Sequence, residues 1–335
     1  MPDRRDPVQD ADDGAHDLYD VVTWEPRTWV DRLSVRIYRL LVATTRGAVV
    51  LVALVILVSQ FALTGVAALS NPAIGVFIFL SVVPAAVIAA SVWRSDVTRR
   101  EPLGLLVGTF LLGILFASFA AVLNALAQPI FQVIPVAGAA LFFYLVVGPV
   151  EETVKWLAVR LHAYRSEQFR AVVDGAVYGA AAGLGFATIE NTLYISQQYL
   201  QAVQAAGASD ALIRAALPTA AVRSFAGPGH VIYSSFAGYY LGLAKYNREN
   251  AGPIVVKGLL IAAFIHGTYN AVVTSLPALV TLAGLGIGTG VAFLGFVVAY
   301  DGLFLYLLLR KIRRYRTAYE ATDAGRDAEA VTDPP

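Results

Sequence analysis

Residues 48–69 read AVVLVALVILVSQFALTGVAAL, a run of 22 residues without a charged side chain. An α-helix needs about 20 apolar residues to cross the hydrocarbon core of a bilayer, because each residue rises ~1.5 Å through ~30 Å. Comparable runs occur at 74–93, 103–126, 137–160, 171–195, 220–244, 254–275 and 282–309. The sequence therefore predicts an all-α fold, a polytopic transmembrane helical bundle of about eight spans.

The composition agrees with a membrane protein, since 57% of the 335 residues are hydrophobic and 15% are charged, against roughly 25% charged in soluble domains. The charge lies mainly at the ends: 14 of 24 acidic and 13 of 25 basic residues lie before residue 47 or after residue 309. A soluble enzyme and a disordered protein are excluded. The net charge of +1 offers no basic surface for nucleic acid, so no nucleic-acid partner is expected.

The connections between the apolar runs alternate in charge. Arg and Lys residues precede the first run and follow the second, fourth, sixth and eighth, whereas 70–73, 127–136 and 276–281 carry none. Because short loops rich in Lys and Arg stay in the cytoplasm, both termini are predicted inside, N-in/C-in. The predicted organisation is a cytoplasmic acidic and Arg-rich tail at 1–47, a transmembrane domain at 48–309 and a cytoplasmic charged tail at 310–335.

The first tail ends in apolar residues at helical spacing among arginines. This pattern predicts either a helix lying on the cytoplasmic leaflet or an extension of the first span. The residues are Trp29, Val30, Leu33, Ile37, Leu40 and Leu41. In the fifth span, Gly175, Gly179, Gly183 and Gly185 would let neighbouring helices approach closely, so this span should be central in the bundle.

Four titratable side chains from four spans are predicted to share one depth. Such groups at membrane depth cost a few kcal/mol each and are functional hypotheses by default. From the assumed helix ends, Glu151 and His230 lie ~17 and ~15 Å below the outer edge of the membrane. Glu190 and His266 lie ~10 and ~13 Å from the same edge. The four side chains therefore fall in one layer.

Two carboxylates and two imidazoles can deprotonate a water and stabilise an oxyanion, or they can bind Zn²⁺. Cysteine is absent, so a thiolate cannot take part. Glu152 follows Glu151 at an angle of about 100° on the helix and must play a separate role. Asn270 lies one turn after His266 and extends its polar face. A protease, a proton-coupled transporter and a non-catalytic membrane scaffold all remain open from these residues alone.

Six short stretches make the chain resemble the PrsW family of intramembrane proteases, which is related to the type II CAAX prenyl endopeptidases. They occur in the family's order and cover a core of roughly 140–275. The stretches are VEETVKW at 150–156, DGAVYGAA at 174–181, GFATIEN at 185–191, PGH at 228–230, GYYLGLAK at 238–245 and HGTYN at 266–270.

The resemblance implies peptide-bond hydrolysis in the cell membrane by a multi-pass endopeptidase. It implies Glu151 as general base, Glu152 as the residue that orients it or a partner, and His266 with Asn270 on the oxyanion side. His230 is a residue that the PrsW family has in addition to the motifs shared with the prenyl endopeptidases, and Glu190 stands where those relatives carry His. The family is described as metalloproteases, which gives Glu190, His230 and His266 as Zn²⁺ ligands, although a metal-free glutamate mechanism remains open. The implied partners are the lipid bilayer and a membrane-protein substrate, single-span and anti-sigma-factor-like.

Overall fold

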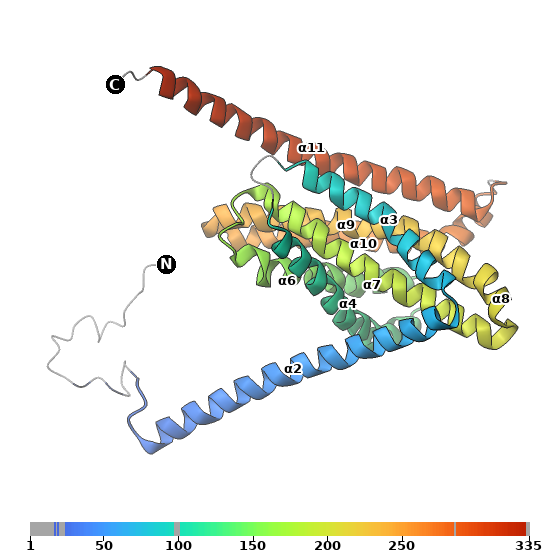
Figure 1. The fold of residues 1–335 in the computed structure, drawn as a ribbon, viewed down its shortest axis with the longest axis horizontal. Helices are drawn as coiled ribbons and strands as arrows, with labels where there is room; N and C mark the ends of the chain where they lie inside the picture. The colour runs from blue at the N-terminus through green and yellow to red at the C-terminus, as the bar shows by residue number, and fades with distance from the viewer. Residues whose placement is uncertain (1–16, 18, 20–23, 97–100, 285, 333–335) are drawn as a thin grey trace. The chain divides into compact units, whose positions relative to one another are not determined.

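The computed structural model describes residues 17, 19, 24–96, 101–284 and 286–332, and these are overwhelmingly helical (Figure 1). Short irregular turns separate some helices, of which the π-helical turns Phe143–Val147 and Leu212–Ala216 are the clearest. The helices are α2 Trp29–Ser70, α3 Ala73–Arg94, α4 Leu103–Gln132, α5 Gly138–Phe142, α6 Gly148–Leu161, α7 Val172–Ala206, α8 Ala208–Ala211, α9 Leu217–Tyr246, α10 Ala251–Leu282 and α11 Thr289–Thr332.

The chain divides into two units, residues 1–55 and 56–335. The described part of the first unit is mainly the beginning of α2. Its first turn is capped by Asp31, whose carboxylate accepts hydrogen bonds of 2.7 Å from both the backbone N–H and the hydroxyl of Thr28. The helix runs without interruption from Trp29 into the first apolar run. All elements of the candidate site belong to the second unit.

Six helices in the described part of the chain are long and apolar enough to cross a membrane. They contain the segments 51–70, 73–94, 103–132, 172–205, 248–282 and 289–321. The prediction of a helical, membrane-spanning chain is confirmed, and six of the predicted eight spans are recovered. The other two predictions, 137–160 and 220–244, are helical but carry the charged and polar side chains of the site. The run 137–160 is divided by a π-helical turn, which leaves α6 with 14 residues, and the polar side chains of 220–244 lower its hydropathy.

Helix α7 is the centre of the second unit, as its glycines predicted. The apolar window of α7 is 89% buried, against 17% for α11. A Cβ added at Gly175, Gly179 or Gly183 would lie 2.1–2.4 Å from a backbone carbonyl oxygen of α9. On another face, a Cβ at Gly185 would lie 2.1 Å from the carbonyl oxygen of Phe110 in α4. Small residues thus let α7 pack backbone to backbone between α9 and α4.

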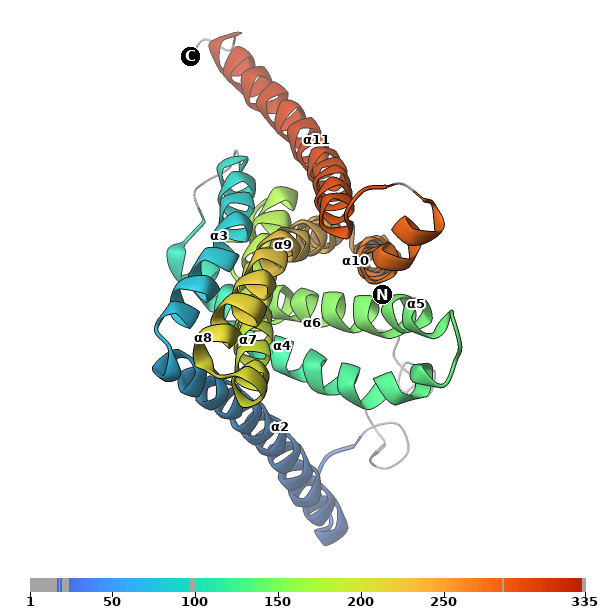
Figure 2. The ribbon, with the colours of Figure 1, turned by 90° about the vertical axis from the view of Figure 1, so that its right-hand side faces the viewer.

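The remaining site helices surround this pair. Helix α6 packs between α4 and α10, and Figure 2 shows α4 and α6 side by side. Pro149 has no backbone N–H, so a local kink is expected just before the glutamates. The structure has the π-helical turn Phe143–Val147 directly before α6, where Pro149 occupies the first turn. This irregular turn sets the direction in which Glu151 and Glu152 point.

Candidate active site

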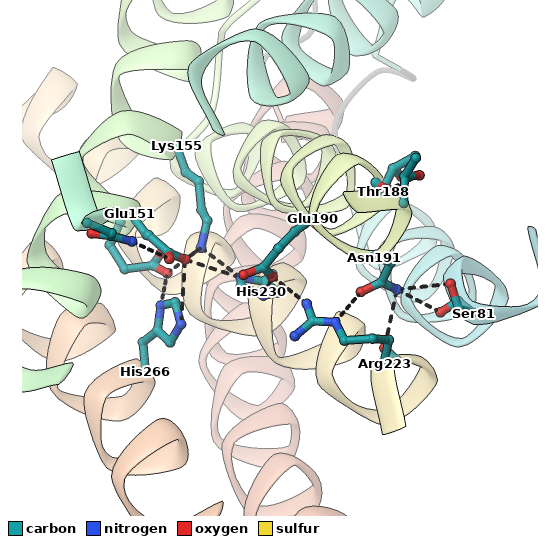
Figure 3. Close-up of polar contacts among 12 residues, drawn as sticks. Ser81, Glu151, Lys155, Thr188, Glu190, Asn191, Arg223, His230 and His266 are labelled. Carbon is teal, nitrogen blue, oxygen red and sulfur yellow. Dashed lines mark hydrogen bonds and ion pairs between the residues drawn. The ribbon is translucent and has the colours of Figure 1, made fainter. Parts of the chain in front are cut away.

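The site lies where α6, α7, α9 and α10 converge, and all six predicted site residues are found there. Glu151, Glu190, His230, His266 and Asn270 line one cavity of about 910 Å³. Glu152 is fully buried beside it, with 0% of its side chain exposed. The four-residue layer expected from helix depth is therefore a real cluster. Figure 3 shows its polar contacts, which run from His266 through the glutamates and Arg223 to Ser81.

Glu151 combines burial with an unsatisfied oxygen. The residue is 4% exposed, and its Oε1 accepts a hydrogen bond of 3.0 Å from Nδ2 of Asn124 on α4. Among the described residues, nothing hydrogen-bonds to its Oε2. That oxygen lies 3.7 Å from Nζ of Lys155 and 3.7 Å from Nε2 of His266. A buried carboxylate oxygen without a hydrogen bond is costly, so it marks a position where water or another ligand is expected.

Glu152 points away from Glu151 and fixes the neighbouring side chains. Its Oε1 accepts hydrogen bonds of 2.7 Å from Nζ of Lys155 and 2.9 Å from Nδ1 of His266. Its Oε2 accepts a weaker hydrogen bond of 3.3 Å from the Ser234 hydroxyl. Because a carboxylate only accepts, Nδ1 of His266 carries a proton and Nε2 faces Glu151. The two adjacent glutamates thus have separate environments, as their angle on the helix requires.

His230 links the glutamates of α6 to that of α7. Its Nε2 lies 2.7 Å from Oε2 of Glu190, and its Nδ1 lies 2.9 Å from Nζ of Lys155. Glu190 also forms an ion pair with Arg223, and Nε of Arg223 donates to Oδ1 of Asn191 at 2.8 Å. Asn191 is in turn anchored to Ser81 on α3 at 3.2 Å. Glu190 is therefore part of a charge-paired network.

His266 is held by packing as well as by Glu152. The ring of Tyr233 lies 5.6 Å from its ring, and the His230 ring stands perpendicular to it at 5.1 Å. The Tyr233 hydroxyl donates a hydrogen bond of 2.8 Å to Asp301 on α11. Asp301 therefore contacts the tyrosine that packs on His266.

Comparison with known proteins agrees with this geometry. The model of the PrsW family of intramembrane metalloproteases matches residues 101–303, which is more than half of the chain and contains every site residue. The chain belongs to the PrsW family. It is therefore an intramembrane protease of the cell membrane, and the predicted resemblance is confirmed.

Several proteins named Protease PrsW are similar over most of their length. The protein from Shouchella clausii (strain KSM-K16) is 30% identical over 199 residues, 59% of this chain and 83% of that protein. The one from Halalkalibacterium halodurans is 30% identical over 194 residues, covering 57% and 80%. The one from Bacillus subtilis (strain 168) is 27% identical over 197 residues, covering 58% and 81%. No solved structure matches the chain.

The donor set of this PrsW site fits a divalent metal. The ligand atoms of Glu151, His230 and His266 all lie within 4.8 Å of one another, and all three residues are buried. One carboxylate and two imidazoles are ordinary zinc ligands. The contact of Glu152 with Nδ1 of His266 is the kind of carboxylate–histidine pair that orients a metal ligand. The sequence had grouped Glu190 with the two histidines, whereas the compact group contains Glu151.

Sequence reasoning missed two members of the PrsW site. Asn124 holds Glu151 from α4, and its signal was an amide inside the apolar run 103–126. Tyr233 packs on His266 and lies three residues after His230, on the same face of α9. Lys155 lies one turn after Glu151, but its shortest carboxylate contact is to Glu152. Arg223 forms its ion pair with Glu190.

Proposed function

We propose that this PrsW-family protein hydrolyses a peptide bond of a membrane protein with Glu151 as the general base. The observation that carries the proposal is the free Oε2 of Glu151 in the described structure, buried and facing the 910 Å³ cavity. Asn124 holds the other oxygen, so the carboxylate is fixed before substrate binds. A preorganised base in a site shielded from bulk water is suited to activating a single water.

The reaction follows from these positions. Glu151 takes a proton from water, and the water oxygen forms a bond to the scissile carbonyl carbon. The side-chain amide of Asn270, which lines the same cavity, donates to the resulting oxyanion, and His266 does so from Nε2 when its ring is protonated. The C–N bond then breaks as Glu151 returns its proton to the leaving amine nitrogen. The products are a carboxylic acid and an amine.

The other predicted residues position this pair. Glu152 accepts from Nδ1 of His266 at 2.9 Å, which directs Nε2 toward Glu151. Glu190 accepts from Nε2 of His230 at 2.7 Å and is itself fixed by Arg223. These contacts support positioning roles for Glu152, Glu190 and His230, because fixed rings and carboxylates lower the reorganisation needed during the reaction.

Zn²⁺ is the metal that this donor chemistry suits, with Glu151, His230 and His266 as ligands. A bound divalent ion would supply Lewis-acid polarisation and a more acidic water. The set of Glu190, His230 and His266 expected from the sequence is the alternative. It is less favoured because Glu190 is already paired with Arg223. Activity measured with and without a chelator, together with the metal content of the protein, distinguishes a zinc-dependent mechanism from a metal-free glutamate mechanism.

The substrate is proposed to be a single-span, anti-sigma-factor-like membrane protein, cut near the outer side of its span. We place both termini in the cytoplasm, supported by the Arg- and Lys-rich connections on one side. The predicted depths of ~10–17 Å below the outer edge put the Glu151 layer near the middle of the ~30 Å core, leaning toward its outer half. The cavity reaches the turn after α4, where Ile134 and Val136 contribute to its lining. These apolar residues suit a hydrophobic segment of a membrane protein.

Replacing Glu151 with Gln tests the assignment. The amide keeps the shape but cannot take a proton, so cleavage should fall about 10²–10⁴-fold. Membrane fractions from cells producing the wild type, Glu151→Gln or the control Glu249→Gln are compared by mass spectrometry of new protein termini. Glu249 is an exposed glutamate in the turn before α10.

Peptides that span the termini found in this way are then cleaved by purified enzyme in liposomes. Termini present with the wild type and Glu249→Gln but absent with Glu151→Gln are the expected result. Cleavage by Glu151→Gln at the wild-type rate would remove Glu151 as the base.

A further inference from the structure

Lys155 is a fully buried cation inside the candidate metal site. Its side chain is 0% exposed, and its Nζ lies 2.7 Å from Oε1 of Glu152, 2.9 Å from Nδ1 of His230 and 3.7 Å from Oε2 of Glu151. The same ammonium lies 4.1 Å from the centre of the Phe186 ring. Lys155 therefore contacts two of the three residues whose ligand atoms could hold a metal.

The direction of these hydrogen bonds is set by the ammonium. An ammonium group has protons to donate and no lone pair, so Nδ1 of His230 must be the acceptor. The proton of the neutral His230 ring is then on Nε2, where it is donated to Glu190 at 2.7 Å. Consequently Nδ1 is the His230 nitrogen whose lone pair faces the site, and Lys155 already uses that lone pair.

We propose that the Lys155 ammonium and a divalent metal ion are mutually exclusive occupants of the position between Glu151, His230 and His266. An imidazole nitrogen has a single lone pair in the ring plane. A zinc ion would bind along it at about 2.0–2.1 Å, whereas Nζ of Lys155 lies 2.9 Å from Nδ1 of His230. The two cations would also repel each other strongly, because a buried site has a low effective dielectric constant.

The exclusion deepens the proposed function and rests on it, since it concerns how the same site acquires a metal. With Lys155 in place, Glu151 keeps Oε2 available for water, and the site already contains a cation near its base. With Lys155 displaced, the carboxylate and both imidazoles are available as ligands, and Glu151 is bound to the metal. Lys155 thus decides whether Glu151 acts as a base or as a ligand.

Metal binding to charge-deleted variants tests this proposal without measuring cleavage. Wild type, Lys155→Met and the control Lys257→Met are purified without a tag and stripped of metal. They are then equilibrated with chelator-buffered Zn²⁺, and bound zinc is counted by mass spectrometry. Lys257 is an exposed lysine on α10. We expect Lys155→Met to bind one Zn²⁺ per chain at least about tenfold more tightly than the wild type, because the competing charge is gone. Lys257→Met should match the wild type.

Two further variants make the result specific. Lys155→Met/His266→Ala should lose the increase in zinc affinity, which would show that the zinc binds at this site. Lys155→Met leaves Glu152 buried without its cation and could unfold, so Lys155→Met/Glu152→Gln removes both charges and should show the same gain. Equal zinc affinity of the wild type and either folded Lys155 variant would overturn the proposal, as would a gain that survives loss of His266. Neither result would affect the assignment of Glu151, which is judged by cleavage.

Discussion

Two clusters of carboxylate and imidazole side chains in the described part of this protein have similar spacing but different partners. The Glu151 cluster comprises Glu151, His230 and His266, and the Glu101 cluster comprises Asp96, Glu101 and Asp174. In each, three potential ligand atoms lie within 4.8 Å of one another. The first lies between α6, α9 and α10, and the second lies around the N-terminal ends of α4 and α7.

The difference lies in what the carboxylates contact. Asp174 accepts hydrogen bonds from the backbone N–H groups of Arg170 and Ala171, at 2.6 and 2.9 Å, and so caps α7. Glu101 accepts from the hydroxyl of Tyr178. Glu151 instead presents an oxygen to a cavity, next to an ammonium and two imidazoles. Closeness of potential ligand groups is therefore a weak indicator of a catalytic site. Contact of a carboxylate with titratable side chains and with a cavity is a stronger indicator.

The largest expected difference between the clusters is in catalysis. Glu152→Gln replaces a carboxylate that accepts from both Lys155 and His266, so kcat should fall about 10–100-fold, as for other residues that orient a functional histidine. KM should change little, because Glu152 does not line the cavity. Glu101→Gln makes the same chemical change in the second cluster and should leave kcat within about twofold. Comparable losses of kcat in both variants would contradict the distinction drawn between the clusters.

A smaller effect on kcat should distinguish two glycines of α7 that are both packed closely against α9. A Cβ at Gly175 would lie 2.1 Å from the carbonyl oxygen of Gly238, and one at Gly183 would lie 2.4 Å from that of His230. Either alanine should destabilise the α7–α9 packing by about 1–3 kcal/mol, measured as a lower Tm. Gly183→Ala should also lower kcat, because it displaces the backbone of His230. If Gly175→Ala lowers kcat by as much as Gly183→Ala does, at equal fractions of folded protein, the loss of activity comes from general loosening of the bundle and not from displacement of His230.

The smallest expected effect is on the pH dependence of stability. Burial raises the pKa of the Glu101 carboxyl from 4.5 to about 8. A raised pKa in the folded state means that the contribution to stability is fully present below pH 4.5 and is lost as pH rises through 8. The Tm of the wild type should therefore decrease between pH 5 and pH 8.5, and Glu101→Gln should reduce that decrease by about a few °C. Parallel Tm curves for the two proteins would show that Glu101 does not titrate in this range.

Much of this arrangement could be predicted because it depends on patterns along single helices. Apolar length predicted the spanning helices, and the glycine spacing predicted the central place of α7. Estimated depth brought Glu151, Glu190, His230 and His266 together, since the rise per residue is constant and each helix crosses the same layer.

Contacts that depend on helix rotation could not be predicted. Lys155 is positioned to reach either neighbouring glutamate, and only packing against α9 decides that its closest one is Glu152. Asn124 could be recognised as unusual in its apolar run, but its partner lies 27 residues away on another helix. Pro149 indicated an irregularity in the run 137–160, but hydropathy does not report that the irregularity is a π-helical turn.

That turn makes the identity of the two glutamates a matter of register. A π-helical turn contains about one residue more than the α-helical path it replaces, and each residue advances an α-helix by about 100°. If the same residues formed a regular α-helix onward from Gly138–Phe142, Glu151 would occupy the angular position that Glu152 has now. The extra residue in the π-helical turn therefore determines which direction each of the two chemically identical side chains, Glu151 and Glu152, takes on α6.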